Sequence, residues 1–305
     1  MWNPASVEAA TLIFDDEFNG TALDTNAWVA MNRPGDSSNN EVECYIPGNA
    51  TVSNGSLALT AKVDSSCRGY SYTSAMVQWK SFQFTYGTIE YRAKMAGGTG
   101  TWPAIWLLGA NCQQTNVASA DNTPPCNWPV AGSDEIDMTE IMKGAMTTVG
   151  QYVHSGSFDF NCNASTSNVS QNWHTYQLDW APGSLIWKID GVTTCTLTRN
   201  VPSTPMFLIM NVALGGQGGT VNGSTLPQST LVDYVRVYSS GSTASPCDLN
   251  ADNQVNAVDY QIALNQALGS PACTNADLNS DAKCNVIDVQ RVANAAQGQA
   301  CRVGP

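Results

Sequence analysis

The stretch "HTYQLDWAPGSLIWKIDG", residues 174–191, alternates apolar and polar side chains on both sides of a Pro-Gly pair. Alternation with a period of two places the apolar side chains on one face of a β-strand, and a turn sequence between two such runs is typical of a hairpin. A second turn sequence, "IDG", closes the stretch. The stretch therefore predicts two antiparallel strands, each half-buried in a sheet.

The same alternation recurs in "SLALTAKV" (56–63), "FTYGTIEYRAKM" (84–95) and "LVDYVRVYS" (231–239). Clusters of Gly, Asn and Pro separate such segments, and no amphipathic helix of useful length precedes residue 247. Many short strands with regular turn signals are typical of a β-sandwich or jelly roll. We therefore expect an all-β domain of two antiparallel sheets over residues 1–238.

The composition excludes some partners and favours others. The 305-residue chain has 13 Lys and Arg against 25 acids, a formal charge of −12. Phosphate binding needs clustered basic side chains, so we expect neither nucleic acid nor an anionic membrane as a partner. No run of 18 apolar residues occurs, so no membrane-spanning helix is expected. A neutral ligand such as an uncharged sugar is compatible with this charge. The chain itself is expected to be a monomer.

The ten cysteines point to an oxidising compartment. Their number is even and no pair has zinc-ribbon spacing, which favours disulfides, with buried free thiols as the alternative. The opening "MWNPASVEAA" lacks a basic stretch followed by an apolar one, so we expect no signal peptide within this chain. An extracellular location is the expectation that follows.

A Ser/Gly/Pro-rich run, "SSGSTASP" at residues 239–246, predicts a linker. After it, "DLNADNQVNAVD" begins at Asp248 and "DLNSDAKCNVID" begins at Asp277, an internal repeat offset by 29 residues. A short segment of helical character follows each copy. Residues 247–305 therefore predict a small α-helical module with two loops, and its four cysteines predict disulfides that support a small core.

Each copy of the repeat has the spacing of a calcium loop. Positions 1, 3, 5 and 12 carry oxygen side chains, and position 7 offers its carbonyl. Alanine at position 6 of the second loop, where a left-handed turn is needed, makes that loop the weaker candidate. The predicted ligands are Asp248, Asn250, Asp252, Gln254 and Asp259 in the first loop, and Asp277, Asn279, Asp281, Lys283 and Asp288 in the second.

This module resembles a type I dockerin, in which each loop ends in Asp. The resemblance implies structural calcium and a cohesin as partner. Positions 10 and 11 of the loops, Ala257–Val258 and Val286–Ile287, are more apolar than dockerins usually show. A stabilising or adaptor module is therefore the alternative to cohesin binding.

The most acidic stretch of the chain is "GSDEIDMTEIMKG", residues 132–144. On a β-strand, Glu135 and Asp137 share one face, whereas the odd spacing to Glu140 places that residue on the other face. A β-bulge around Met138–Thr139 would bring Glu140 back beside them. A solvated strand edge is the simpler alternative to a functional cluster.

Paired carboxyls have a known chemical use. Carboxyls about 5–5.5 Å apart suit a retaining glycosidase, in which one carboxylate attacks and the other donates a proton. A like-charged neighbour and burial raise the pKa of the acid, so that it is protonated near neutral pH.

The surrounding sequence resembles glycoside hydrolase family 16, and within it the laminarinases (endo-β-1,3-glucanases). "DEIDMTEIM" is similar to the bulged active-site strand of that family. Seven further blocks follow the family's order along residues 12–238: "FDDEFNG", "NNEVECY", "YTSAMVQWKSFQFTYGTIEYRAKM", "GTGTWPAIWLLG", "WHTYQLDWAPGSLIWKIDG", "MFLIMNVALGG" and "LVDYVRVYS". The resemblance implies a concanavalin-like jelly roll.

The resemblance also implies roles for individual residues. Glu135 would be the nucleophile, Glu140 the acid/base, and Asp137 a residue that tunes the nucleophile. The residues implied to contact sugar are Trp102, Trp106, Asn40, Arg92 and His154.

A calcium ion on the convex side of the domain is a further implication of the family. Glu17 and Asp233 would bind it, together with the backbone at Gly55. A pair of surface acids near the ends of the domain is the alternative.

The function expected is that of a secreted, endo-acting, retaining hydrolase of β-1,3-glucan or mixed-linked β-1,3-1,4-glucan. An agarase-like hydrolase of another polysaccharide would keep the fold and change the substrate. A non-catalytic glycan-binding protein is the rival of a different class, but relatives of that kind have lost one or both glutamates, which this chain keeps.

Overall fold

The computed structural model describes residues 10–113, 126–130, 132–239, 245–250, 255–297, 299 and 301–304. Two compact units are present, one of them Leu12–Ser240 and the other holding Gly241–Pro305. The predicted linker, residues 239–246, lies largely outside the described residues.

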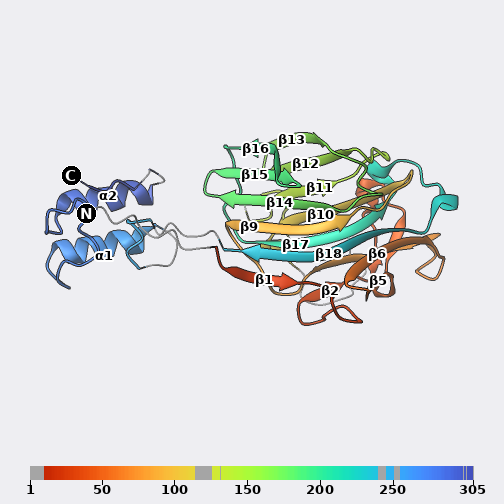
Figure 1. Ribbon diagram of the computed structural model, residues 1–305, viewed down its shortest axis with the longest axis horizontal. Helices are drawn as coiled ribbons and strands as arrows, with labels where there is room; N and C mark the ends of the chain where they lie inside the picture. Colours follow the sequence, from red (N-terminus) through yellow and green to blue (C-terminus); the bar gives the residue numbers. More distant parts are fainter. Residues whose placement is uncertain are drawn as a thin grey trace. The chain divides into compact units, whose positions relative to one another are not determined.

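The larger unit contains a sheet of seven antiparallel strands in the order β13-β12-β11-β10-β17-β8-β2 (Figure 1). These strands are β2 (Trp28–Ala30), β8 (Met76–Trp79), β10 (Thr101–Gly109), β11 (Glu135–Glu140), β12 (Thr148–Ser155), β13 (Phe158–Ser165) and β17 (Met206–Leu214).

A second sheet has eleven strands, with β16-β15-β14-β9-β18-β6-β7-β4-β3 in its main path, β1 against β18 and β5 against β6. Among these strands β4 and β7 pair in parallel, and the other described pairings are antiparallel. The strands are β1 (Leu12–Asp16), β3 (Arg33–Pro34), β4 (Glu43–Tyr45), β5 (Ala50–Ser53), β6 (Ser56–Val63), β7 (Tyr72–Ser74), β9 (Gly87–Lys94), β14 (His174–Ala181), β15 (Ser184–Ile189), β16 (Val192–Leu197) and β18 (Gln228–Tyr238).

The predicted hairpin at residues 174–191 is present as β14 and β15, which pair from Tyr176 opposite Ile189 to Ala181 opposite Ser184. Every second side chain of β14 is buried, as the alternation predicts. The expectation of a two-sheet all-β sandwich is confirmed.

Aromatic side chains fill the core between the sheets. Trp28, Trp79, Trp180 and Trp187 are each at most 1% exposed, and Tyr91 and Tyr176 stack with ring centroids 5.2 Å apart. Four of the nine tryptophans therefore belong to the core and are unavailable to a ligand.

Three disulfides hold the larger unit, which confirms the prediction from the cysteine count. They join Cys44 to Cys67, Cys112 to Cys126 and Cys162 to Cys195. The last bond links β13 to β16, the edge strands of the two sheets. It therefore closes the sandwich along one side.

The smaller unit has two α-helices, α1 (Ala257–Ala267) and α2 (Val286–Ala296), which begin in capping boxes. A small core of Leu249, Ala263, Leu278, Val289 and Val292 lies beneath them. Two disulfides, Cys247–Cys301 and Cys273–Cys284, complete the pairing of all ten cysteines. Neither helix has the length and apolar character that crossing a membrane demands, and the same holds for the rest of the described chain.

Candidate active site

A cleft of about 970 Å³ lies on the outer face of the seven-stranded sheet. Side chains from β10, β11, β12, β13 and β17 form its floor, and the segment around residues 33–41 forms one wall. Glu135, Asp137 and Glu140 all line it. The acidic strand is therefore part of a concave site and not a solvated edge.

A β-bulge brings the three acids to one face. The pairing of β11 with both neighbours shifts between Asp137 and Glu140, and Met138 has no opposite residue on β10. Met138 and Thr139 are both buried in the core, at 2% and 0% exposure. Two successive inward side chains restore the alternation, so the predicted bulge is present and Glu140 faces the cleft with Glu135.

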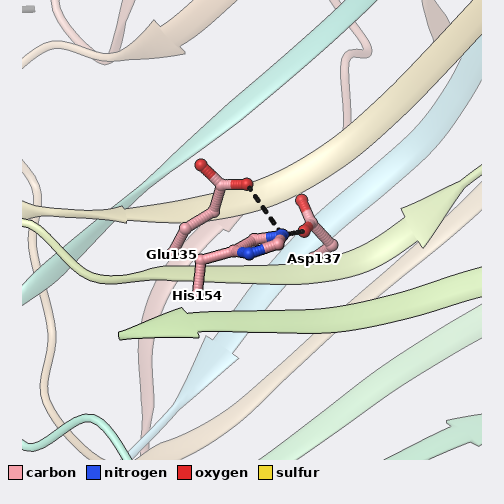
Figure 2. Close-up of side chains that lie close together, drawn as sticks. All are labelled: Glu135, Asp137 and His154. Atoms are coloured by element: carbon pink, nitrogen blue, oxygen red, sulfur yellow. Dashed lines mark ion pairs between the residues drawn. The ribbon is translucent and has the colours of Figure 1, made fainter. Parts of the chain in front are cut away.

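His154 on β12 lies beside the first two acids (Figure 2). Its Nε2 is 3.9 Å from Glu135 Oε1 and 3.8 Å from Asp137 Oδ2, while its Nδ1 is 2.7 Å from Asp159 Oδ1. The imidazole is thus oriented by Asp159 on β13. Asp134 takes no part, because its side chain is directed away from the cleft. Its carboxylate accepts a hydrogen bond of 2.6 Å from Ser155 Oγ.

Burial raises the pKa of all three carboxyls. For Glu140 the result is a pKa of about 7, with the Glu135 charge adding to burial and a hydrogen bond from Trp102 opposing it. The pKa of Asp137 is raised well above its usual range by burial and by the charges of Glu135 and Glu140. A neutral Asp137 donates a hydrogen bond to Glu135. Burial raises the pKa of Glu135, whereas the charge of His154 and this hydrogen bond lower it.

This combination of protonation states permits acid–base chemistry. Glu140 can hold a proton near neutral pH, and Glu135, hydrogen-bonded by Asp137, can be the anion. Two of these acids also belong to a group that could hold a metal ion, since Glu135, Asp137 and His154 offer ligand atoms within 4.8 Å of one another.

Two tryptophans of β10 line the cleft, as predicted. Trp102 donates its Nε1–H to Glu140 Oε1, and Trp106 donates to Asn211 Oδ1 at 2.9 Å. Their hydrogen bonds fix the two indole rings, which offer apolar faces to a ligand.

Side chains of β12 and β13 extend the cleft in a way the sequence did not reveal. Tyr152 lies over Gly150, where an added Cβ would come within 2.3 Å of its phenol oxygen, and it donates to Asn163 Oδ1 at 3.0 Å. Asn161 also lines the cleft. The alternation in "DFNCN", residues 159–163, was the available signal for a polar face on this strand.

Trp128 is a further cleft residue missed by the sequence analysis. It is 48% exposed, its ring centroid lies 5.9 Å from that of His154, and it hydrogen-bonds Glu135. The Cys112–Cys126 disulfide ties down the chain two residues before it. Residues 114–125 and 131 of the intervening loop lie outside the described part.

The prediction that Arg92 faces the cleft is wrong. Arg92 lies on β9 of the eleven-stranded sheet, where the alternation buries Tyr91 and turns Arg92 outward. Its guanidinium pairs with Asp233 at 2.6 Å and lies 4.9 Å from the Trp173 ring centroid.

Asn40 is also placed differently from the prediction. The neighbouring Asn39 and Glu41 line the cleft, whereas Asn40 is not among the lining residues. Its backbone is left-handed, with φ of 59°, and its carbonyl accepts from Gly216 N at 3.0 Å. The contribution of Asn40 is therefore to the turn that carries its two neighbours.

The predicted calcium ligands on the convex side are engaged by arginines. Glu17 accepts from Arg236 at 2.7 and 3.0 Å, and Asp233 accepts from Arg92 at 2.6 Å. Gly55 has a left-handed backbone, with φ of 73°. Because both carboxylates already have cationic partners, the donor set as arranged does not fit a calcium ion.

The loops of the smaller unit share a hydrogen-bonded aspartate at position 12, and the second loop fits a hard cation better than the convex side does. Asp259 and Asp288, at position 12, accept from backbone N–H groups of their own loops at 2.8–3.3 Å. Asp252 and Gln254 lie outside the described residues, while Asp248 is 8% exposed and Asn250 is exposed.

The second loop has the turn of a calcium loop despite its alanine. Ala282 takes the left-handed conformation, with φ of 66°, and its N–H donates to Asp277 at 2.9 Å. Asp281 accepts from Asn279 Nδ2 at 3.0 Å and from Lys283 N at 2.9 Å. Carboxylate and amide oxygens therefore gather where calcium would need them.

Paired carboxyls in a cleft are the groups that a carboxylate glycosidase uses, and here they lie in a tryptophan-lined cleft of a β-sandwich. The model of glycosyl hydrolases family 16 matches residues 38–236, and that of the dockerin type I domain matches residues 246–295. The chain belongs to glycosyl hydrolases family 16 and carries a dockerin type I domain.

The curated proteins that the chain resembles include a glucan endo-1,3-beta-glucosidase and an endo-1,3-1,4-beta-glycanase. The chain is 31% identical to glucan endo-1,3-beta-glucosidase A1 of Niallia circulans over 76% of its length and 38% of that protein. It is 30% identical to endo-1,3-1,4-beta-glycanase ExsH of Rhizobium meliloti over 74% of its length and 51% of that protein. The chain thus spans about half the length, or less, of these curated relatives.

Solved structures resemble the larger unit. The catalytic domain of an endo-1,3-beta-glucanase (laminarinase) from Thermotoga petrophila RKU-1 superposes with a TM-score of 0.66 at 31% identity. That match covers 76% of this chain and 98% of the Thermotoga chain.

Proposed function

We propose that the chain is an endo-acting, retaining hydrolase of β-1,3-glucan or mixed-linked β-1,3-1,4-glucan. The observation that carries this proposal is the bulged strand, which presents Glu135, Asp137 and Glu140 together to the cleft, with a pKa of about 7 for Glu140. The similarity to a glucan endo-1,3-beta-glucosidase and to an endo-1,3-1,4-beta-glycanase supports the choice of substrate.

The reaction would proceed in two steps. Glu135 attacks the anomeric carbon while Glu140 gives its proton to the leaving glycosidic oxygen, and a glycosyl ester on Glu135 results. Water then attacks the same carbon, Glu140 takes its proton, and Glu135 leaves as a carboxylate. Asp137, hydrogen-bonded to Glu135, would hold the nucleophile in line and not react itself.

Product analysis on laminarin, lichenan and agarose in parallel tests the substrate. Glu135→Gln is expected to abolish release of reducing sugar, with Asp134→Asn as the matched control, because Asp134 is the neighbouring acid directed away from the cleft. Activity of Glu135→Gln equal to that of the parent would overturn the catalytic assignment. Cleavage of agarose alone would support the agarase-like alternative.

A chelator separates proton chemistry from metal chemistry at this site. Glu135, Asp137 and His154 could also hold an ion. Since the proposed reaction uses no metal, we expect full activity after treatment with a chelator and desalting. Loss of activity that added metal restores would contradict the two-carboxylate reaction.

For the smaller unit we propose extracellular calcium binding and docking to a cohesin. The second loop places acidic and amide oxygens around a turn, and Val258, Val286 and Ile287, at positions 10 and 11 of the two loops, are 51–77% exposed. Calcium titration of the full chain, with and without reductant, followed by pull-down on immobilised cohesins, tests both parts. Calcium binding without capture by any cohesin would favour the stabilising role.

A further inference from the structure

Glu43 on β4 is a fully buried acid that the reaction above does not use. Its Oε2 accepts from Leu214 N at 2.8 Å and from Val42 N at 3.1 Å. Its Oε1 is also buried, and no donor among the described residues is directed at it. A charged carboxylate with one unsatisfied buried oxygen is costly, whereas the same oxygen can carry a proton and donate it.

The acceptor for such a proton lies beside it. A Cβ built on Gly35 would be 2.7 Å from Glu43 Oε1 and 2.9 Å from Glu41 Oε2, so the two oxygens face one small space. Glu41 Oε2 also accepts from Asp36 N at 2.8 Å and from Tyr45 Oη at 3.2 Å. Three donors would then converge on Glu41, which identifies Glu41 as the anion and Glu43 as the neutral partner.

The electrostatics agree with this geometry. Burial raises the pKa of Glu43 well above its usual range, and the charge of Glu41 and a hydrogen bond between the two carboxyls raise it further, whereas hydrogen bonds from Tyr45 and from Leu214 N lower it. A second negative charge on the fully buried Glu43, beside that of the half-buried Glu41, is strongly disfavoured, so one proton is retained between them. The titratable and charged groups on the described elements packed against Glu43 are the following: Glu41 and Tyr45 on its own segment, Arg33 on β3, Asp36 between β3 and β4, and Tyr72 on β7.

A chain of hydrogen bonds runs from this pair to the cleft. Tyr45 donates to Glu41 and accepts from Asn211 Nδ2 at 3.3 Å, which leaves Asn211 Oδ1 to accept from Trp106 Nε1 at 2.9 Å. The direction of these bonds is fixed at both ends, because the Glu41 carboxylate can only accept and the Trp106 indole N–H can only donate. Trp106 lies opposite Asp137 in the strand register and lines the cleft.

We propose that Glu41 and Glu43 form a carboxylic acid–carboxylate pair, with the proton on Glu43, that positions Trp106 for the sugar chain through Tyr45 and Asn211. This inference rests on the proposed function for its effect on substrate, but the pair itself does not depend on it. Glu43 is a positioning residue and touches no substrate.

The first test compares Glu43→Gln with Glu43→Leu in the full chain. An amide keeps a donor toward Glu41, so kcat/KM of Glu43→Gln stays within about twofold of the parent, whereas Glu43→Leu loses about tenfold, mainly through KM. In a Trp106→Phe background the effect of Glu43→Leu on KM disappears. Equal losses for Gln and Leu, or an unchanged effect of Glu43→Leu in that background, overturn the positioning role.

The second test needs no activity. An acid with a raised pKa in the folded protein stabilises the fold fully below its ordinary pKa, and this contribution is lost as the pH rises through the raised value. The Tm of Glu43→Gln minus that of the parent therefore increases from acidic to neutral pH, while Glu90→Gln, on β9 of the same sheet, shows no such trend. A difference that is constant with pH overturns the pair even if the protein cleaves no glucan.

Discussion

The protonation of Glu140 is set by individual neighbours in the cleft. Its pKa of about 7 results from burial and the Glu135 charge, against the hydrogen bond from Trp102. A general acid must hold its proton, so kcat/KM is expected to fall as the pH rises through about 7. The basic limb of the pH profile therefore reports the environment of this one carboxyl.

Trp102→Phe is expected to move that limb to higher pH. The substitution removes the donor that stabilises the charged form of Glu140, so the pKa rises, by on the order of one unit. Trp106→Phe is the matched control, because that indole donates to Asn211 and not to Glu140. Profiles of kcat/KM against pH for both variants decide the matter, and equal limbs would contradict the assignment of Glu140 as acid.

The acids of the cleft could be predicted from the sequence, because a carboxyl group can donate a proton or attack as an anion wherever it lies in a cleft. Tyr152 and Trp128 could not, since an aromatic side chain reads equally well as core in a chain with nine tryptophans and ten tyrosines. Arg92 was misplaced for a related reason. Alternation separates Arg92 from Tyr91 but does not say which sheet, or which side of it, faces the ligand.

At the scale of a strand, the bulge of β11 places side chains for stability on one face and side chains for catalysis on the other. Met138 is 2% exposed in the core, and Met138→Ala is expected to lower the free energy of unfolding by about 2–5 kcal/mol. The register shift is made by backbone pairing, so kcat/KM below the unfolding transition is expected to match the parent. Urea unfolding and initial rates measure the two effects, and an inactive but folded variant would contradict this separation.

The neighbouring strand β12 depends on a residue without a side chain. Gly150→Ala would place a Cβ within 2.3 Å of the phenol oxygen of Tyr152, so we expect a loss of about 1–3 kcal/mol in the free energy of unfolding. Gly48→Ala is the control, because a Cβ there meets nothing within 4 Å. In a Tyr152→Ala background the penalty at position 150 is expected to vanish, and a penalty that persists would place the strain elsewhere.

The strands themselves were predictable, because period-two alternation is a local property of the chain. The bulge was also predictable, since the odd spacing between Glu135 and Glu140 leaves no regular strand with both acids in the cleft. The order of strands in each sheet was not, because it depends on pairings between distant segments such as β9 and β18. Cross-strand neighbours such as Tyr152 and Asn163 follow from that order.

For the whole molecule, the composition change at residues 239–246 predicted two units, and the even number of cysteines predicted disulfides. The pairings could not be derived, because ten cysteines allow many connectivities and spacing alone does not choose among them. The structure gives the smaller unit two bonds of different span, 54 residues for Cys247–Cys301 and 11 residues for Cys273–Cys284.

These spans predict unequal contributions to the stability of the smaller unit. In the chain-entropy account, the longer loop stabilises by about 4 kcal/mol and the shorter by about 3 kcal/mol. When each bond is replaced by a pair of serines, calorimetry of the full chain is expected to show a lower temperature for one transition only. The shift is larger for the Cys247–Cys301 pair.

Calcium is expected to raise that same transition, because an ion bound by the folded loops stabilises them by mass action. Glucan hydrolysis would be unchanged in both variants, since neither bond lies in the unit that carries the cleft, and a parallel loss of activity would contradict the independence of the two units.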